Sequence, residues 1–210
     1  MRLFTSFIIT QITLLLFFSQ ASAAVYLSAN VLASQLNDSD IDAQSTEVGT
    51  LEFETGYGTS LAIGTWFTPS TPGRIELEGS YRINDVKEGT IFGQNVSTLD
   101  GSSSRTSLMF NAIHDYNDVN FIFKPFFSLG IGATYIELDL GEIGKADDTV
   151  FTYQASIGES YRLTKKTFFD LQYRYLGTTE PTFSSSNPAF SEFDYEHSSH
   201  NILLGVRHTF

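Results

Sequence analysis

The chain has 210 residues, with 24 acidic and 12 basic side chains, a formal net charge of −12 and no cysteine. This acidic balance argues against a nucleic-acid partner, whose phosphates are bound through Lys and Arg, and the lack of cysteine excludes disulfides and thiolate metal sites. Charged residues are 17% of the chain, below the ~25% of average soluble domains, while aromatic residues reach 14%.

The first residues are typical of a secretory signal peptide. Arg2 precedes an apolar run from Phe7 to Phe18, and the small residues of Ala21-Ser22-Ala23 follow as a cleavage site. The apolar run is short for a membrane span, so an uncleaved anchor is the weaker alternative. We therefore predict a cleaved signal peptide over residues 1–23 and one mature domain over residues 24–210.

Eight segments of the mature chain alternate with the period of two that is typical of β-strands. In chain order they cover residues 25–33, 56–67, 74–85, 105–115, 123–135, 151–163, 168–177 and 201–210. The third segment, "RIELEGSYRIND", is the clearest, because Ile75, Leu77 and Tyr81 alternate with charged or small polar residues. No stretch of the mature chain approaches the ~20 apolar residues of a membrane helix, which favours strands.

The links between these segments alternate in length. Long polar links lie near residues 35–53, 85–103, 137–150 and 177–198, and short ones follow the second, fourth and sixth segments. Long loops at one end and short turns at the other are the pattern of outer-membrane barrels. We predict an all-β fold, an eight-stranded antiparallel up-and-down transmembrane β-barrel in the bacterial outer membrane.

The two faces of each segment indicate which side meets lipid. The apolar face is continuous on all eight segments and its aromatic residues gather near the segment ends, as at the two membrane interfaces. A soluble carrier barrel with the faces reversed is the alternative. Glu159 shares the apolar face and is expected at an interface, near a short turn. On the other face we predict a lumen charge network of Arg74, Glu76, Glu78, Arg82, Arg105, Lys124, Asp170, Arg174 and Arg207.

Three segments resemble a known family. The strings "FKPFFSLGIGATY", "FDLQYRYLG" and "HNILLGVRHTF" are similar to strand signatures of opacity-protein-like surface antigens and of OmpA-type outer-membrane barrels. The resemblance implies that the final strand is read by the barrel assembly machinery, through Gly205, His208 and the terminal Phe210. His208 departs from the family pattern, which usually has an aromatic residue there, as does Leu203, where a polar residue is usual.

Residues His197 to His200, "HSSH", are the most site-like string. A metal pair lacks a third ligand, and a His197–Ser199 pair of the lipid A deacylase type lacks an acid to orient the histidine. We therefore predict no enzyme, cofactor or metal, but a structural or surface-antigen and adhesion protein that displays extracellular loops. Its predicted partners are outer-membrane lipid, the assembly machinery and a host or environmental surface ligand. A small-pore channel and a lipid A-modifying enzyme are the alternatives.

Overall fold

The computed structural model describes residues 24–37, 39–43, 46–67, 72–91, 94–95, 101–116, 122–139, 145–179, 194–195 and 198–210. The predicted signal peptide lies outside the described residues, so its boundary at Ala23 stays a prediction. No helix among the described residues is long and apolar enough to cross a membrane. The strands are β1 (Val25–Leu36), β2 (Ser39–Ala43), β3 (Thr46–Phe53), β4 (Gly56–Trp66), β5 (Gly73–Ile91), β6 (Gln94–Asn95), β7 (Ser102–Asp115), β8 (Phe123–Asp139), β9 (Lys145–Arg162), β10 (Thr167–Thr178), β11 (Asp194–Tyr195) and β12 (Ser198–Thr209).

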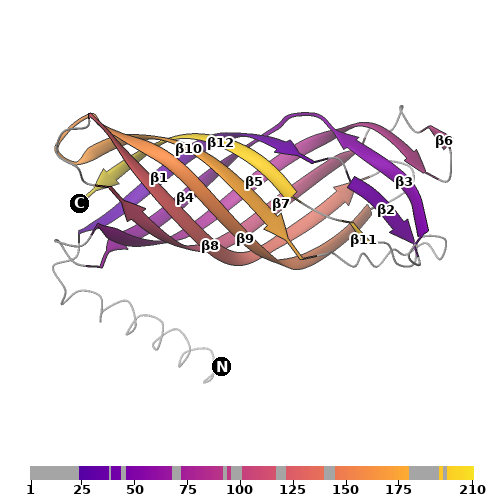
Figure 1. Ribbon diagram of the computed structural model, residues 1–210, viewed down its shortest axis with the longest axis horizontal. Helices are drawn as coiled ribbons and strands as arrows, with labels where there is room; N and C mark the ends of the chain where they lie inside the picture. Colours follow the sequence, from indigo (N-terminus) through magenta and orange to yellow (C-terminus); the bar gives the residue numbers. More distant parts are fainter. Residues whose placement is uncertain are drawn as a thin grey trace, which may run out of the picture.

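The eight longer strands β1, β4, β5, β7, β8, β9, β10 and β12 close into one antiparallel barrel (Figure 1). Each pairs with its neighbour in sequence order, and β12 returns to pair with β1. A path through the paired residues leaves β1 at Tyr26 and returns to it at Leu36, a shear of ten residues. The predicted eight-stranded up-and-down barrel is therefore confirmed.

Side chains alternate strictly between the outside and the lumen. On β1, Val31 is 60% exposed whereas Ser34 is fully buried. On β5, Leu77 and Tyr81 face outward while the charged residues between them face inward. A soluble carrier barrel would have the opposite arrangement, because its apolar residues fill the interior. The orientation fits a barrel whose outer face contacts hydrocarbon and whose interior is polar.

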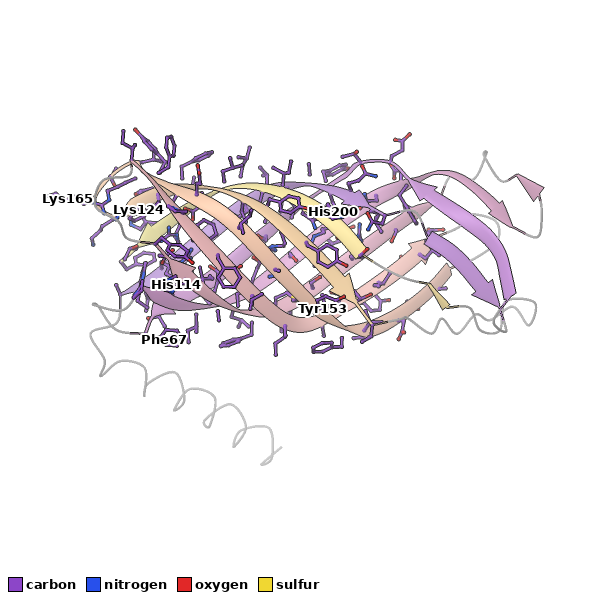
Figure 2. All side chains as sticks on the ribbon, in the orientation of Figure 1. Phe67, His114, Lys124, Tyr153, Lys165 and His200 are labelled. Atoms are coloured by element: carbon purple, nitrogen blue, oxygen red, sulfur yellow. The ribbon has the colours of Figure 1, made fainter. Side chains whose placement is uncertain are left out.

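Aromatic side chains on the outer face gather toward both barrel ends. Phe67 and His114 lie near the short turns, and Tyr153 lies in the other half of the barrel (Figure 2). Exposed aromatic residues near the short turns include Phe67, Tyr116, Phe123, Tyr161, Phe169 and Phe210, and those toward the long links include Tyr57, Tyr81, Tyr135, Phe151, Tyr153 and Tyr173. Such belts suit the two membrane–water interfaces. Glu159 faces outward next to the turn after β9, as expected.

All four predicted long links contain strand residues, so these link boundaries were wrong. β8 continues to Asp139 and β9 starts at Lys145, with these two residues paired, which leaves little of the expected 137–150 link. β5 continues to Ile91, and the β2–β3 hairpin pairs with this extension. Figure 1 shows these segments extending the barrel at the end away from the C-terminus. The extensions of β8 and β9 were missed because their apolar residues change face beyond the membrane.

This change of face is clearest on β8 and β9. Along β8, Ile131, Ala133 and Tyr135 point outward, but beyond Tyr135 the inward residues Ile136 and Leu138 are the apolar ones. Buried inward side chains at the extracellular strand ends form an apolar cap, made of Leu36, Ile136, Leu138, Val150 and Leu176. Outside the membrane the barrel exterior meets water, so the ordinary rule of an apolar interior returns.

The orientation predicts how an added charge acts at two depths of the outer face. Leu129 lies near the middle of β8 and is 53% exposed, and Leu163, equally exposed, lies at the turn after β9. We expect Leu129→Arg to lower the free energy of unfolding by about 2–4 kcal/mol, and Leu163→Arg by about 0–1 kcal/mol, because the cost falls toward the interface. Urea unfolding of protein refolded in lipid vesicles measures both. Equal small losses would contradict the orientation.

Candidate functional site in the barrel lumen

The lumen holds the residues that carry most of the buried charge. Eight of the nine residues of the predicted network are buried in it: Arg74, Glu76, Glu78 and Arg82 on β5, Arg105 on β7, Asp170 and Arg174 on β10, and Arg207 on β12. The ninth, Lys124, is half-buried at the periplasmic start of β8, opposite Ser160. Strand alternation alone brings these side chains inside, because all share the inward phase.

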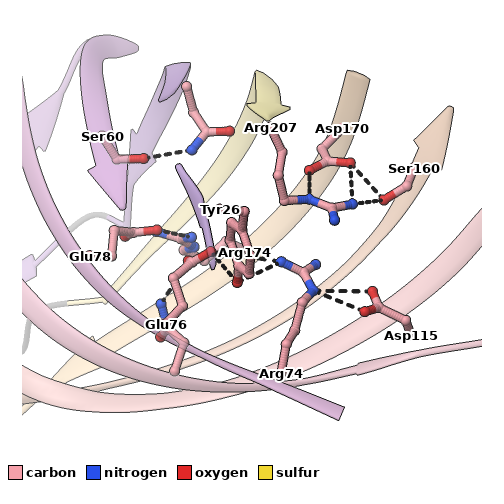
Figure 3. A network of polar contacts seen from close by, with 12 residues as sticks. Tyr26, Ser60, Arg74, Glu76, Glu78, Asp115, Ser160, Asp170, Arg174 and Arg207 are labelled. Atoms are coloured by element: carbon pink, nitrogen blue, oxygen red, sulfur yellow. Dashed lines mark hydrogen bonds and ion pairs between the residues drawn. The ribbon is translucent and has the colours of Figure 1, made fainter. Parts of the chain in front are cut away.

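Arg74 is the centre of the first cluster (Figure 3). Its Nε donates to Asp115 of β7 at 3.0 Å, and its Nη1 donates to the hydroxyl of Tyr26 on β1 at 3.0 Å. The Tyr26 hydroxyl in turn donates to Glu76 at 3.0 Å. Arg74 also lies 3.7 Å from Glu76. One guanidinium thus links two carboxylates and a phenol from three strands.

Arg174 and Glu78 form a bar across the lumen. Arg174 Nη1 and Nη2 donate to the two carboxylate oxygens of Glu78 at 2.6 and 2.8 Å. Their strands, β10 and β5, are not neighbours in the barrel, so the pair spans the interior. A two-pronged pair of this kind is strong and directional, which offsets part of the cost of removing both charges from water.

Arg207 organises the third cluster. It donates from Nε to Asp170 at 2.9 Å and from Nη2 to Ser160 at 3.0 Å. Ser160 donates to the same carboxylate at 2.6 Å. The Arg207 guanidinium also stacks over the Phe168 ring, with 4.7 Å to its centroid. Figure 3 shows this cluster joining side chains from β9, β10 and β12.

The remaining two arginines lie toward the extracellular side. Arg82 and Arg105 are directly opposite each other in the β5–β7 register. Arg82 donates to Ser107 at 3.2 Å, and Arg105 donates to the side-chain oxygen of Asn84. Ser107 continues into a hydroxyl chain with Thr134 at 2.8 Å. The side-chain hydrogen bonds in this part of the lumen thus include neutral hydroxyl and amide oxygens.

Glycine makes room for the largest groups in this narrow interior. A Cβ added at Gly64 would overlap the ring of Tyr26, and one added at Gly205 would overlap the amide of Asn30. A polar cavity of about 20 Å³ remains, lined in part by Glu76, Glu78 and Arg174. This space is enough for about one water molecule. Side chains therefore fill this part of the lumen.

Several residues of the clusters were not predicted as site residues. Tyr26, Asp115 and Ser160 bond directly to the ion-paired groups, but they were not among the nine charged residues named from the sequence. Their inward phase was visible in the alternation. What the sequence lacked was the register between strands, which decides that Tyr26 of β1 meets Arg74 of β5.

The C-terminal strand is fixed by the barrel closure. The backbone N–H of Phe210 donates to the carbonyl of Val25 at 2.9 Å. Its side chain is 64% exposed on the outer face and meets the His208 ring edge-on, with centroids 5.3 Å apart. Gly205 faces the lumen between Asn30 and Asp170. The predicted assembly residues thus lie on both faces of β12.

The "HSSH" string does not form a shared site in the described residues. Ser199 is fully buried and points into the lumen, whereas His200 lies on the other face and bonds to the Tyr173 hydroxyl at 2.6 Å. His197 lies outside the described residues. Within the described ranges, no group of three or more potential ligands is placed to hold a metal ion.

Comparison with known proteins identifies the family. The family model described as "Outer membrane protein beta-barrel domain" matches residues 11–210. A search of curated proteins found no match. Among solved structures, Neisserial surface protein A is 17% identical with a TM-score of 0.55, over 89% of this chain and 97% of that chain. OprG of Pseudomonas aeruginosa is 13% identical with a TM-score of 0.63, over 90% and 97%. The outer membrane protease OmpT of Escherichia coli is 9% identical with a TM-score of 0.54, over 91% and 99%.

At these identities the solved structures support the fold alone, while the family match covers nearly the whole chain. The apolar outer face, the polar lumen and this match agree. The chain belongs to the outer-membrane β-barrel protein family and resides in the lipid of the bacterial outer membrane.

Proposed function

We propose that the protein is a non-enzymatic, closed barrel that displays its extracellular strands and loops for surface interaction. The observation that carries the proposal is the filled interior: three arginine-centred clusters occupy the lumen, and the apolar cap lies at its extracellular end. A closed, cross-braced barrel offers no route for a solute and serves best as a rigid support. Recognition sites are commonly carried by loops on such supports.

The extracellular strand extensions support a display role. β5, β8 and β9 continue beyond the outer aromatic belt, and the β2–β3 hairpin pairs with the β5 extension. Glu137 and Asp147 are opposite each other on this extension and point away from the interior. The display surface therefore includes paired strands that carry outward-facing carboxylates. The proposed ligand of this surface is a component of a host or environmental surface.

The location of Ser199 argues against the lipid A-modifying alternative. A barrel enzyme that acts on lipid needs its nucleophile at the lipid-facing surface, within reach of a base. Ser199 is in the lumen and accepts a hydrogen bond from Asn201 at 3.2 Å. OmpT has this fold and is a protease, so the fold alone does not decide between enzyme and support. The proposal depends on the side-chain arrangement in this chain.

We also propose that β12 is the segment bound by the barrel assembly machinery during biogenesis. Phe210 ends the strand that closes the barrel, and its exposed ring makes one pairwise contact, with His208, among the described aromatic residues. A ring that is 64% exposed packs little against the rest of the barrel, so it contributes little to the internal packing of the protein. We infer that the assembly machinery binds the Phe210 ring before the barrel closes, when β12 is still an unpaired edge strand.

The display proposal predicts that adhesion depends on the extracellular extension. We expect cells that produce the intact protein to adhere to collagen-coated or polystyrene surfaces more than cells without it. Replacing the β2–β3 hairpin, Ser39–Phe53, by a short Gly-Ser turn should abolish the difference. Heat-modifiable gel mobility checks that the shortened protein still folds. Full adhesion by the shortened variant, or an altered lipid A profile that depends on Ser199, would contradict the proposal.

The closed lumen predicts no stepwise conductance from the refolded protein in planar bilayers. Glu78→Gln keeps the lumen filled, so conductance should stay absent, but it leaves Arg174 without its counter-charge. We expect the free energy of unfolding to fall by about 3–5 kcal/mol. Glu159→Gln, on the outer face beside a turn, is the matched control and should change it little. Defined conductance steps from the unmodified protein would show a pore instead.

The assembly proposal predicts a difference between cells and purified protein. Phe210→Ala should lower the amount of folded barrel in the outer membrane several-fold, while its refolding yield in lipid vesicles stays at the level of the unmodified protein. Phe169→Ala, which truncates another outward aromatic residue near the short turns, is the control and should assemble normally in cells. If both variants behave alike in cells, β12 recognition does not depend on Phe210.

A further inference from the structure

The outer face of the barrel has a depression around Gly79. A Cβ added at Gly79 would meet no atom within 4 Å, so the surface is open there. In the strand register Gly79 lies between Leu61 of β4 and Leu108 of β7. In the next row of outward-facing residues, toward the extracellular side, Tyr81 lies between Thr59 of β4 and Thr106 of β7. Large and small residues therefore alternate along both rows.

The small residues join diagonally into a continuous floor. Thr106 and Tyr135 are paired, as are Leu108 and Ala133, so the pattern continues across β8 and on to Thr149 of β9. We call this feature the lipid-facing trough. Its floor is made by Thr59, Gly79, Thr106, Ala133 and Thr149, and its walls by Leu61 and Leu108 on one side and Tyr81 and Tyr135 on the other. It is an open depression with a volume of about 590 Å³.

The trough climbs through the outer half of the membrane. Gly79 is six residues beyond Gly73, where β5 begins, which on a strand tilted by ~45° places it about 14 Å above the periplasmic end. Tyr135 is twelve residues beyond Phe123, where β8 begins, or about 28 Å above that end. The apolar band of such barrels is about 25 Å tall. The trough thus runs from mid-depth to the extracellular interface.

We propose that this trough binds one acyl chain of an outer-leaflet lipid. It is continuous with the surface that contacts membrane lipid, and its walls are aliphatic or aromatic. A chain in the trough is covered from the floor and both walls, whereas elsewhere it touches a convex surface on one side. The greater apolar contact favours this position. The hydroxyl of Tyr135 then lies at the level of the lipid headgroup, where such side chains are favoured.

A second copy of the chain fits the trough less well. A two-fold contact brings the same patch of each subunit together, so the two depressions would face each other. The space between them would be lined by surfaces with no partner atoms, which loses packing. A flexible acyl chain adapts to the depression instead. The proposal rests on the lipid-facing surface and is independent of the display role.

Filling the trough tests the proposal. The protein is refolded in vesicles of dimyristoyl phosphatidylcholine, extracted into a mild detergent and weighed by native mass spectrometry. We expect the unmodified barrel to keep one lipid molecule. Gly79→Leu should lower the lipid-bound fraction by about tenfold, the factor that corresponds to the packing of one or two methylene groups. Thr106→Leu fills the same floor from the next strand and should act alike.

Ala29→Leu is the matched control, because Ala29 is a small outward residue of β1 outside the trough. It should retain lipid like the unmodified protein, and heat-modifiable gel mobility establishes that each variant is folded. Retention of no lipid by the unmodified protein overturns the proposal, as does equal retention by the filled variants. A dimer that Gly79→Leu converts to monomer also overturns it, since the occupant is then a second copy.

Discussion

Closure of the sheet is the constraint on which everything else depends. In hydrocarbon there is no water to bond to a free backbone N–H or C=O, so a sheet survives there only if its last strand returns to its first. In this chain β12 meets β1 over eleven paired positions, from Tyr26–Thr209 to Leu36–Ser199. The shear of ten residues fixes how wide the cylinder is and therefore how much side-chain volume the interior must hold.

The pairing of the side chains in this interior is the next constraint on the structure. An arginine in a narrow lumen cannot keep its water shell, so it needs partners among the other lumen side chains. Arg74, Arg174 and Arg207 each have a carboxylate within 3.0 Å, and the Arg174–Glu78 pair joins strands that the sheet itself does not connect. The Arg174–Glu78 pair therefore braces the cylinder from inside, while the other two pairs join neighbouring strands. Around these pairs, the described cavity of about 20 Å³ leaves room for about one water molecule.

The alternation of the sequence was enough to predict the eight membrane strands and the inward side of the charged residues. It was not enough for the pairs, because an inward phase does not say which strand faces which across the lumen. Tyr26 was missed for this reason, although it bonds to both Arg74 and Glu76. The strand extension at Ile136 and Leu138 was missed for a different reason, because these inward residues are apolar. The rule that the outward-facing residues of every strand are apolar holds only within the membrane.

This switch of face has a consequence for how the molecule sits in its membrane. On β8 the outward series Leu129, Ile131, Ala133 and Tyr135 is followed at once by Glu137, and at the opposite end Lys165 and Lys166 are exposed at a turn. A shift of the whole cylinder by a few ångströms in either direction would push one of these charged rims into acyl chains. Charged residues at both ends of the apolar outer band therefore fix the depth of the barrel in the membrane. The sequence encodes this depth through the positions at which outward-facing residues change from apolar to charged.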